Sequence, residues 1–385
     1  MNSSKKKVIF IGIVFLQITM FIYVGNQKKG FHIDEIYSHI LSNSYNADRI
    51  ASAEWMWGKN ISGTDFNEFI TVQENEKFAY QKVYYNNSKD CHPPFYYWIL
   101  HSICSIFPNQ FSKWFGIGLN IFLYCIASFL IYMISKELIE NEFMGMLPVL
   151  LYGFSKFAVD TVTFIRMYML LEVFTLFIIY IHIKMFKCGV TLKKIILVWI
   201  TIFFSTMTHY YSIVLNFWVV LLFCCYLLRC KQIKSMFLYG SGSLVSVIFM
   251  FICYPYAIVQ ATGSSTNGIG NEVVKNLFNF KLWVMKMFSI FKEFISYISY
   301  NLIISMCVFF MLCAIFIWFA ILSVDKRKKI VIDKCFVSII AIIILVFLSI
   351  TFIGGENVYL RYIYNIIPLI YIVVITLFDK ILSKR

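Results

Sequence analysis

Apolar runs long enough to cross a membrane recur along the whole sequence, and they limit the possible folds more than any other feature. A helix needs about 20 predominantly apolar residues to cross roughly 30 Å of hydrocarbon. Of the 385 residues, 60% are hydrophobic and 14% are charged. The runs are continuous, whereas strands of a membrane β-barrel alternate between polar and apolar residues. The sequence therefore predicts an all-α polytopic membrane protein.

About ten stretches have the composition of full membrane spans, and a short eleventh stretch is ambiguous. The first span follows three lysines but is followed by no small-x-small cleavage pattern, so we expect a retained helix rather than a signal peptide. The expected spans are Val8–Gly25, Trp114–Ser135, Met144–Ala158, Met167–Met185, Ile195–Met207, Tyr211–Leu228, Met236–Tyr256, Tyr300–Leu322, Ile332–Ile353 and Tyr362–Leu377.

The basic residues predict the orientation of the chain. The net charge is +14, but the lysines and arginines lie between or beside the apolar runs. Short cytoplasmic loops have this pattern, and it gives no indication of nucleic-acid binding. We therefore expect an integral plasma-membrane protein with both termini in the cytoplasm. The clusters are Lys5-Lys6-Lys7, Lys193-Lys194, Arg229/Lys231/Lys234, Lys326-Arg327-Lys328-Lys329 and Lys384-Arg385.

The ambiguous stretch, Phe95 to Pro108, is apolar but short. If it crosses the membrane, every later loop inverts and most of the basic clusters face outward. If it is a re-entrant or interfacial helix, all five clusters face the cytoplasm. We favour the second topology; the first would need a further crossing between Trp114 and Lys193.

Two segments are too polar to cross the membrane. The segment 26–94 holds nearly half of the 20 acidic residues, and we expect a first extracytoplasmic loop with interfacial helices. The segment 257–299 begins with a Gly/Ser/Thr/Asn stretch and continues as an amphipathic pattern. This composition fits a flexible lid followed by an interfacial helix. No internal repeat or separate soluble domain is evident, so residues 1–385 are expected to form one transmembrane domain.

Five polar clusters interrupt the apolar pattern, and the predicted topology places all of them on the extracytoplasmic side. Helix ends that converge on one face can build a single polar site. The clusters are Asp34-Glu35, His92-Pro93-Pro94, Arg166-Met167-Tyr168, His209-Tyr210-Tyr211 and Arg361-Tyr362.

The first two clusters supply an acid pair and a histidine. Asp34 and Glu35 are candidate catalytic carboxylates, and solvent-exposed loop acids are the alternative. Two prolines after His92 suit the start of a helix, where no backbone donor is lost. A plain helix start explains the prolines but not the histidine.

Two arginines predict an anion site. An arginine near a membrane span is costly and usually faces a cavity, although snorkelling to the interface is the alternative for Arg166. Arg361 is likewise an arginine beside a membrane span, at the outer start of the last one. Two guanidinium groups on one face suit a phosphate or pyrophosphate, because the planar fork binds oxyanions bidentately.

The remaining polar groups are candidates for substrate binding. They are Tyr168, His209, Tyr210 and Tyr362, for which an interfacial aromatic belt is the alternative. Asp34, Glu35, His92 and Asp160 leave a divalent metal conceivable, but no spacing resembles a zinc site.

In their order along the chain, these clusters resemble the GT-C membrane glycosyltransferases. Asp-Glu, His-Pro-Pro-Phe-Tyr-Tyr, Arg-Met-Tyr-Met-Leu, Thr-His-Tyr-Tyr and Arg-Tyr are similar to motifs of the protein O-mannosyltransferase and aminoarabinose transferase group, which is glycosyltransferase family 39-like. The similarity runs from Phe31 to about Pro368. One position departs from the pattern: Phe164 stands where relatives often have an acid, and the nearest acid is Asp160.

The resemblance implies a GT-C-like bundle that transfers a sugar from a polyprenyl-phosphate donor at the extracytoplasmic face. It implies that Asp34 is the base in a single inverting displacement, and that His92, Arg166 and Arg361 bind the donor phosphate. The acceptor would be a protein, a glycan or a lipid. A lipid or sugar transporter or flippase, and a polysaccharide polymerase or ligase, are the alternative functions.

Overall fold

The computed structural model describes residues 3–44, 62–262, 279–298, 333–354 and 358–382, and every regular element in them is a helix. Seven of these helices are long and apolar enough to cross a membrane. The spans are α1 (Ser3–Gln27), α7 (Lys113–Leu138), α10 (Tyr168–Cys188), α12 (Tyr211–Arg229), α13 (Ile233–Cys253), α18 (Lys334–Ile353) and the run that joins η4 (Leu360–Ile366) to α19 (Ile367–Leu382). The prediction of an all-α polytopic membrane protein is confirmed.

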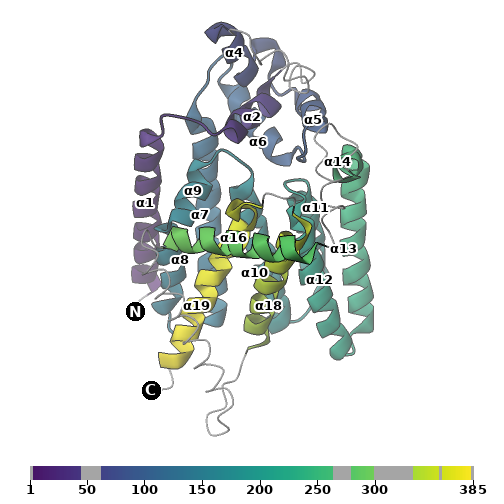
Figure 1. Cartoon of the computed structure of the whole chain (residues 1–385). Coiled ribbons are helices and arrows are strands. Elements are labelled where there is room, and N and C mark those ends of the chain that lie inside the picture. The colour runs from purple at the N-terminus through teal and green to yellow at the C-terminus, as the bar shows by residue number, and fades with distance from the viewer. Residues whose placement is uncertain (1–2, 45–61, 263–278, 299–332, 355–357, 383–385) are drawn as a thin grey trace.

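The helices form a bundle with α10 near its centre (Figure 1). About 67% of the most apolar window of α10 is buried, against 22% in α1 and in α13, which lie at the periphery. Gln17 attaches α1 to the bundle, because its side chain donates to the Val149 carbonyl at 2.9 Å and accepts from the Tyr124 hydroxyl at 2.8 Å. Such polar contacts are a common means of joining helices where lipid surrounds them.

Two expected spans differ from the prediction. Ile195–Met207 corresponds to α11 (Leu192–Thr206), whose 15 residues extend about 22 Å and are therefore shorter than the roughly 30 Å of hydrocarbon that a full span crosses. Met144–Ala158 is broken into η3 (Met144–Met146), α8 (Leu147–Gly153) and α9 (Lys156–Thr163). The break follows Gly153, where an added Cβ would lie 2.0 Å from the Tyr124 hydroxyl, and Ser155 caps the new helix. The predicted span Tyr300–Leu322 lies outside the described residues.

A layer of shorter helices covers one end of the bundle (Figure 1). It consists of α2 (Ile33–Asn43), α4 (Gly63–Ile70), η2 (Glu74–Glu76), α5 (Tyr80–Ser88) and α6 (Phe95–Ile106). The 12 residues of α6 extend about 18 Å, too short to cross the hydrocarbon. The predicted interfacial character of Phe95–Pro108 agrees with this length and position.

The polar segment after α13 also forms helices. It contains α14 (Tyr256–Thr262) and α16 (Phe280–Ile298), and α16 lies crosswise over the spans (Figure 1). The predicted amphipathic helix is confirmed, whereas the Gly/Ser/Thr/Asn stretch lies outside the described residues. Lys286 of α16 donates to the Gly354 carbonyl at 2.6 Å, and Glu293 accepts from the Leu360 amide at 3.1 Å. These contacts attach α16 to the end of α18 and to the start of η4.

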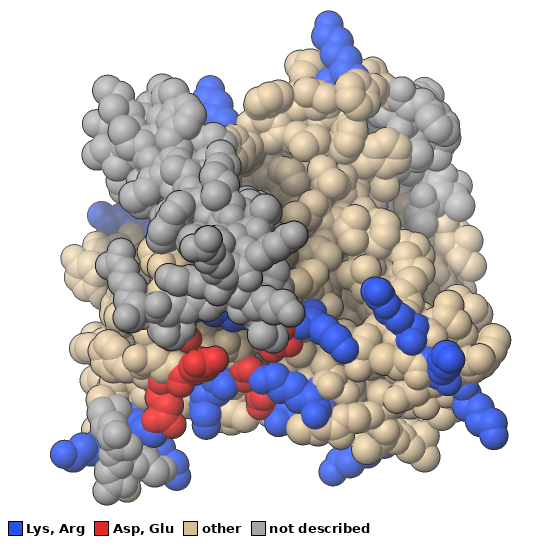
Figure 2. All heavy atoms as spheres, turned by 90° about the horizontal axis from the view of Figure 1, so that it is seen from below, with Lys and Arg blue, Asp and Glu red and all other residues tan. Residues whose placement is uncertain are grey.

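Basic residues collect at the end of the bundle opposite the short helices. The chain enters α1 and leaves α19 at this end (Figure 1). Figure 2 shows this end with Lys and Arg side chains spread around it and a smaller group of acidic side chains. The described basic residues at these helix ends include Lys136, Lys187, Lys193, Lys194, Arg229, Lys234, Lys334 and Lys380.

We predict that Gly116→Ala destabilises the protein while Gly118→Ala, two residues along the same helix, does not. A Cβ at Gly116 would lie 2.2 Å from Ile165 Cγ2, whereas nothing lies within 4 Å of a Cβ at Gly118. Overpacking at Gly116 should cost about 1–3 kcal/mol. The helix gains up to about 1 kcal/mol when alanine replaces an unhindered glycine. Thermal unfolding in detergent would measure both, and equal Tm values would contradict this account of the packing.

Candidate active site

The five polar clusters converge at the end of the bundle covered by the short helices. They lie at the start of α2, before α6, in the α9–α10 connection, in the α11–α12 turn and in η4. The backbone amide of Phe95 donates to the Met207 carbonyl at 3.1 Å, which joins the start of α6 to the end of α11. As a result the His92 and His209 rings lie 5.7 Å apart, although 117 residues separate them along the chain.

Arg166 is the centre of the cluster and is 5% exposed. Its Nη1 donates to the Asp34 backbone carbonyl and to the Tyr97 hydroxyl, both at 3.2 Å. Its Nη2 lies 3.3 Å from His92 Nε2. Because a guanidinium can only donate, His92 Nε2 must accept this hydrogen bond and Nδ1 must hold the proton of the neutral ring. Arg166 is therefore fixed by three different segments.

His92 in turn contacts Asp90, which the sequence analysis missed. His92 Nδ1 lies 2.7 Å from Asp90 Oδ2. Burial alone would raise the pKa of Asp90, but the hydrogen bond from His92 and the positive charge of Arg166 lower it. Asp90 is thus an ionised carboxylate that orients the His92 ring. A carboxylate two residues before the histidine was the available signal.

Asp34 and Arg361 form an ion pair at the edge of the cluster. Arg361 Nη1 lies 3.0 Å from Asp34 Oδ2, and the two side chains are 20% and 23% exposed. The guanidinium also lies over the rings of Tyr359 at 4.6 Å and Phe164 at 5.7 Å. Phe164 stands where an acid was expected, and its ring instead packs against the guanidinium of Arg361.

Glu35 has different surroundings from its neighbour Asp34. It is 1% exposed, and both of its oxygens have partners. Oε1 accepts from Lys28 Nζ and from the Ile165 amide at 2.9 Å, and Oε2 accepts from the His32 amide at 2.9 Å. These contacts connect the end of α1, the start of α2 and the segment that contains Arg166. Their geometry suits a residue that positions Asp34 and Arg166.

The predicted aromatic residues occupy two different places. Tyr168 and Tyr362 lie near the arginines, since the Tyr168 ring stacks on Phe164 at 6.1 Å and the Tyr362 ring lies 5.8 Å from the Arg361 guanidinium. The Tyr210 hydroxyl instead donates to Gln260 of α14. Gln260 also donates to the Asp90 carbonyl at 2.6 Å, so Tyr210 connects α14 to the site from outside.

His209 lies between these groups as a neutral ring. Burial lowers its pKa well below the ordinary value, and the positive charge of Arg166 acts in the same direction. Nδ1 accepts from the Tyr211 amide at 3.0 Å, and the buried Nε2 has no hydrogen-bond partner. Because Nδ1 accepts, the proton of the neutral ring is on Nε2, which is free to donate to a ligand.

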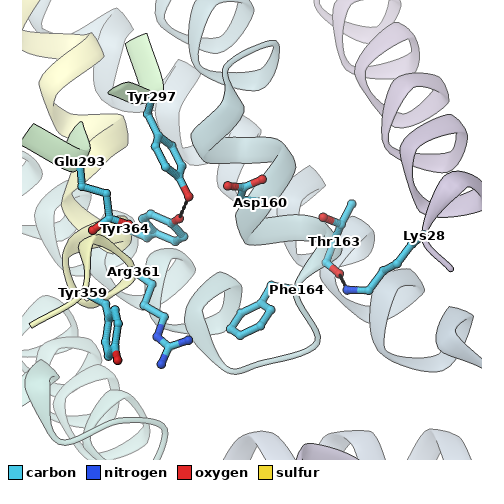
Figure 3. Close-up of a pocket in the computed structure, with 9 residues that line it drawn as sticks. All are labelled: Lys28, Asp160, Thr163, Phe164, Glu293, Tyr297, Tyr359, Arg361 and Tyr364. Carbon is cyan, nitrogen blue, oxygen red and sulfur yellow. Dashed lines mark hydrogen bonds between the residues drawn. The ribbon is translucent and has the colours of Figure 1, made fainter. Parts of the chain in front are cut away.

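A cavity of about 250 Å³ adjoins the ion pair. Figure 3 shows Arg361 extending between Tyr359 and Phe164 at its edge, with Asp160 and Tyr297 on another wall. Hydroxyl, carboxylate, ammonium and aromatic groups all face this space. A second cavity of about 470 Å³ shares Glu293 and Tyr359 with it. The first is lined by Lys28, Asp160, Thr163, Phe164, Glu293, Tyr297, Tyr359, Arg361 and Tyr364.

The residues considered for a metal do not share one centre, because Asp34 pairs with Arg361 and Glu35 with Lys28. Among the described residues, Asp90, Cys91 and His92 have potential ligand atoms within 4.8 Å of one another. Arg166 lies 3.3 Å from His92 Nε2, and its positive charge disfavours a cation at this place. The donors around the arginines suit an anion better.

The fold is similar to that of a known membrane protein. The crystal structure of ArnT from Cupriavidus metallidurans bound to undecaprenyl phosphate matches 98% of this chain with a TM-score of 0.52 and 12% sequence identity. The match covers 61% of the ArnT chain, so this chain spans less than two thirds of that protein. The chain therefore has an ArnT-like, all-helical membrane fold, as the predicted fold class requires.

The sequence comparisons give no finer assignment. No family model matches the sequence, and no curated protein matches it.

We predict that Asp90→Asn lowers Tm at neutral pH and that this difference shrinks in acid. The pKa of Asp90 is depressed in the folded protein. Its stabilising contribution is therefore complete above the unfolded carboxyl pKa of ~3.9 and is lost as the pH falls through the depressed folded pKa. Thermal unfolding of the wild type and of Asp90→Asn, carried out from pH 7 to pH 3, measures the difference in Tm at each pH. A difference in Tm that grows on acidification would contradict the assignment.

Proposed function

We propose that this membrane protein is a glycosyltransferase that uses a polyprenyl-phosphate-linked sugar at the extracytoplasmic face. The observation that carries the proposal is the position of Asp34 between two arginines beside a polar cavity. Arg166 Nη1 contacts the Asp34 carbonyl at 3.2 Å, and Arg361 Nη1 contacts its carboxylate at 3.0 Å. The ArnT-like fold supports this proposal, and that structure contains undecaprenyl phosphate.

The position of the site within the bundle suits a lipid-linked donor. The clusters lie at one end of the spans, so a prenyl chain could lie among apolar helices while its phosphate and sugar reach the polar groups. The opposite end has the basic residues typical of a cytoplasmic face (Figure 2). We therefore place both termini in the cytoplasm and the site outside the plasma membrane, where nucleotide sugars are absent and a lipid-linked donor is needed.

Each group has a role in one inverting displacement. Asp34 accepts the proton of the acceptor hydroxyl as that oxygen attacks C1 of the sugar. Arg166 and Arg361 hold the phosphate and stabilise the charge that develops as it leaves. His92, whose two ring nitrogens contact Arg166 and Asp90, positions Arg166. Bidentate hydrogen bonds from guanidinium groups fit a phosphate leaving group. Glu35 positions Asp34 and Arg166. The cavity in Figure 3 would hold the sugar.

We expect Asp34→Asn to lower transfer by at least about 10²-fold, because the amide cannot accept the proton. Lipid binding should remain, since both arginines stay in place. The measurement is conversion of a radiolabelled polyprenyl-phosphate sugar to polyprenyl phosphate in reconstituted vesicles supplied with cell-envelope extract. Wild-type turnover in the variant would overturn the assignment of Asp34.

We expect Arg166→Ala to lose a polyprenyl-phosphate lipid that copurifies with the wild type. The buried guanidinium is the fixed cation of the site, so its removal leaves the phosphate without a main partner. Mass spectrometry of the extracted lipids is the measurement, and Arg229→Ala is the matched control at an exposed arginine of the opposite end. Absence of any polyprenyl lipid from the wild type and from the control would count against the donor class.

A further inference from the structure

Asp34 and Arg361 are paired with each other, although the proposed reaction needs each of them for a different partner. The proposed base must present a carboxylate oxygen to the acceptor, and the proposed phosphate ligand must present its guanidinium to the donor. Instead, Arg361 Nη1 lies 3.0 Å from Asp34 Oδ2. A carboxylate oxygen that accepts from a guanidinium is not available to an acceptor hydroxyl.

The two arginines are held in different ways. Arg166 is buried, with hydrogen bonds to Asp34, Tyr97 and His92, so it is fixed in place. Arg361 is 20% exposed, lines the cavity and lies over the rings of Tyr359 and Phe164. Ring faces hold a cation without prescribing one direction for its N–H groups.

Arg361 can therefore change its acceptor without leaving its place. In Figure 3 the guanidinium lies between Tyr359 and Phe164 at the edge of the cavity. A phosphate in this cavity would offer two oxygens to the guanidinium fork, whereas Asp34 offers one at 3.0 Å. Bidentate, charge-assisted pairs are stronger than single contacts.

We propose that Arg361 masks the Asp34 carboxylate in the free protein and that the donor phosphate displaces Asp34 from it. This inference rests on the proposed function and adds an order of binding to it. The base becomes available to an acceptor hydroxyl only after the donor has bound. Arg166 keeps its partners throughout, so the site exchanges a single ion pair.

The consequence can be measured as a competition, because Asp34 and the lipid phosphate share one guanidinium. Undecaprenyl phosphate would be titrated onto the full-length protein in nanodiscs, and its Kd measured for wild type and Asp34→Asn. Loss of the competing carboxylate should tighten binding by about three- to tenfold, the range expected for one partly exposed ion pair. Asp160→Asn is the matched control, since this carboxylate lines the same cavity but has no ion pair with Arg361.

A second background separates competition from simple charge repulsion. If Asp34 acts through Arg361, Asp34→Asn should tighten binding in the wild-type background and leave it unchanged in Arg361→Gln, as a double-mutant cycle would show. Equal tightening in both backgrounds, or by Asp34→Asn and Asp160→Asn alike, overturns the masking. Should Arg361→Gln bind too weakly to titrate, the comparison of the two carboxylate variants decides. Failure of the wild type and Asp34→Asn to bind undecaprenyl phosphate would instead overturn the proposed function.

Discussion

The site depends on one buried carboxylate, Glu35. Its oxygens accept hydrogen bonds from Lys28, Ile165 and His32. These residues belong to three different segments of the chain, which meet at Glu35. Burying a charge is costly unless every lone pair is satisfied, and these contacts offset that cost. A network of this kind fixes the geometry of its members more strictly than apolar packing does. The relative positions of Asp34 and Arg166 follow from it.

Most of the fold could be predicted, because the bilayer restricts what an apolar segment can do. In lipid, backbone groups have no water to bind, so long apolar runs become helices. One local outcome could not be predicted in this way: the helix breaks after Gly153, a residue that packs closely against Gln17 and Tyr124 of other helices. The short helix α6 was predicted from the length of its apolar run and from the basic clusters, because its composition alone resembles that of a span.

The candidate site could be predicted where a charged residue interrupts an apolar pattern. Arg166 and Arg361 were found by this rule, since a charge near a span is costly and needs a purpose. Asp90 and Lys28 were missed, because each lies in a polar segment where charged residues are common. The partner of Lys28 is distant, since its ammonium donates to the carbonyl of Thr163, 135 positions further along the chain, and no local pattern records such a contact. For Asp90 the local signal was His92, two residues later.

The crosswise helix α16 connects the site to its surroundings mechanically. Its exposed side includes Phe280 and Phe288, each 69% exposed, which suits contact with lipid. Its polar side is attached through Glu293 to the amide of Leu360, the residue before Arg361. A mismatch between bilayer thickness and a transmembrane helix costs fractions of a kcal/mol per ångström, and Lys286 attaches α16 to the end of the span α18. A change in the bilayer that shifts α16 would therefore shift the position of Arg361 at the cavity edge. The lipid chosen for reconstitution is an experimental variable for this reason.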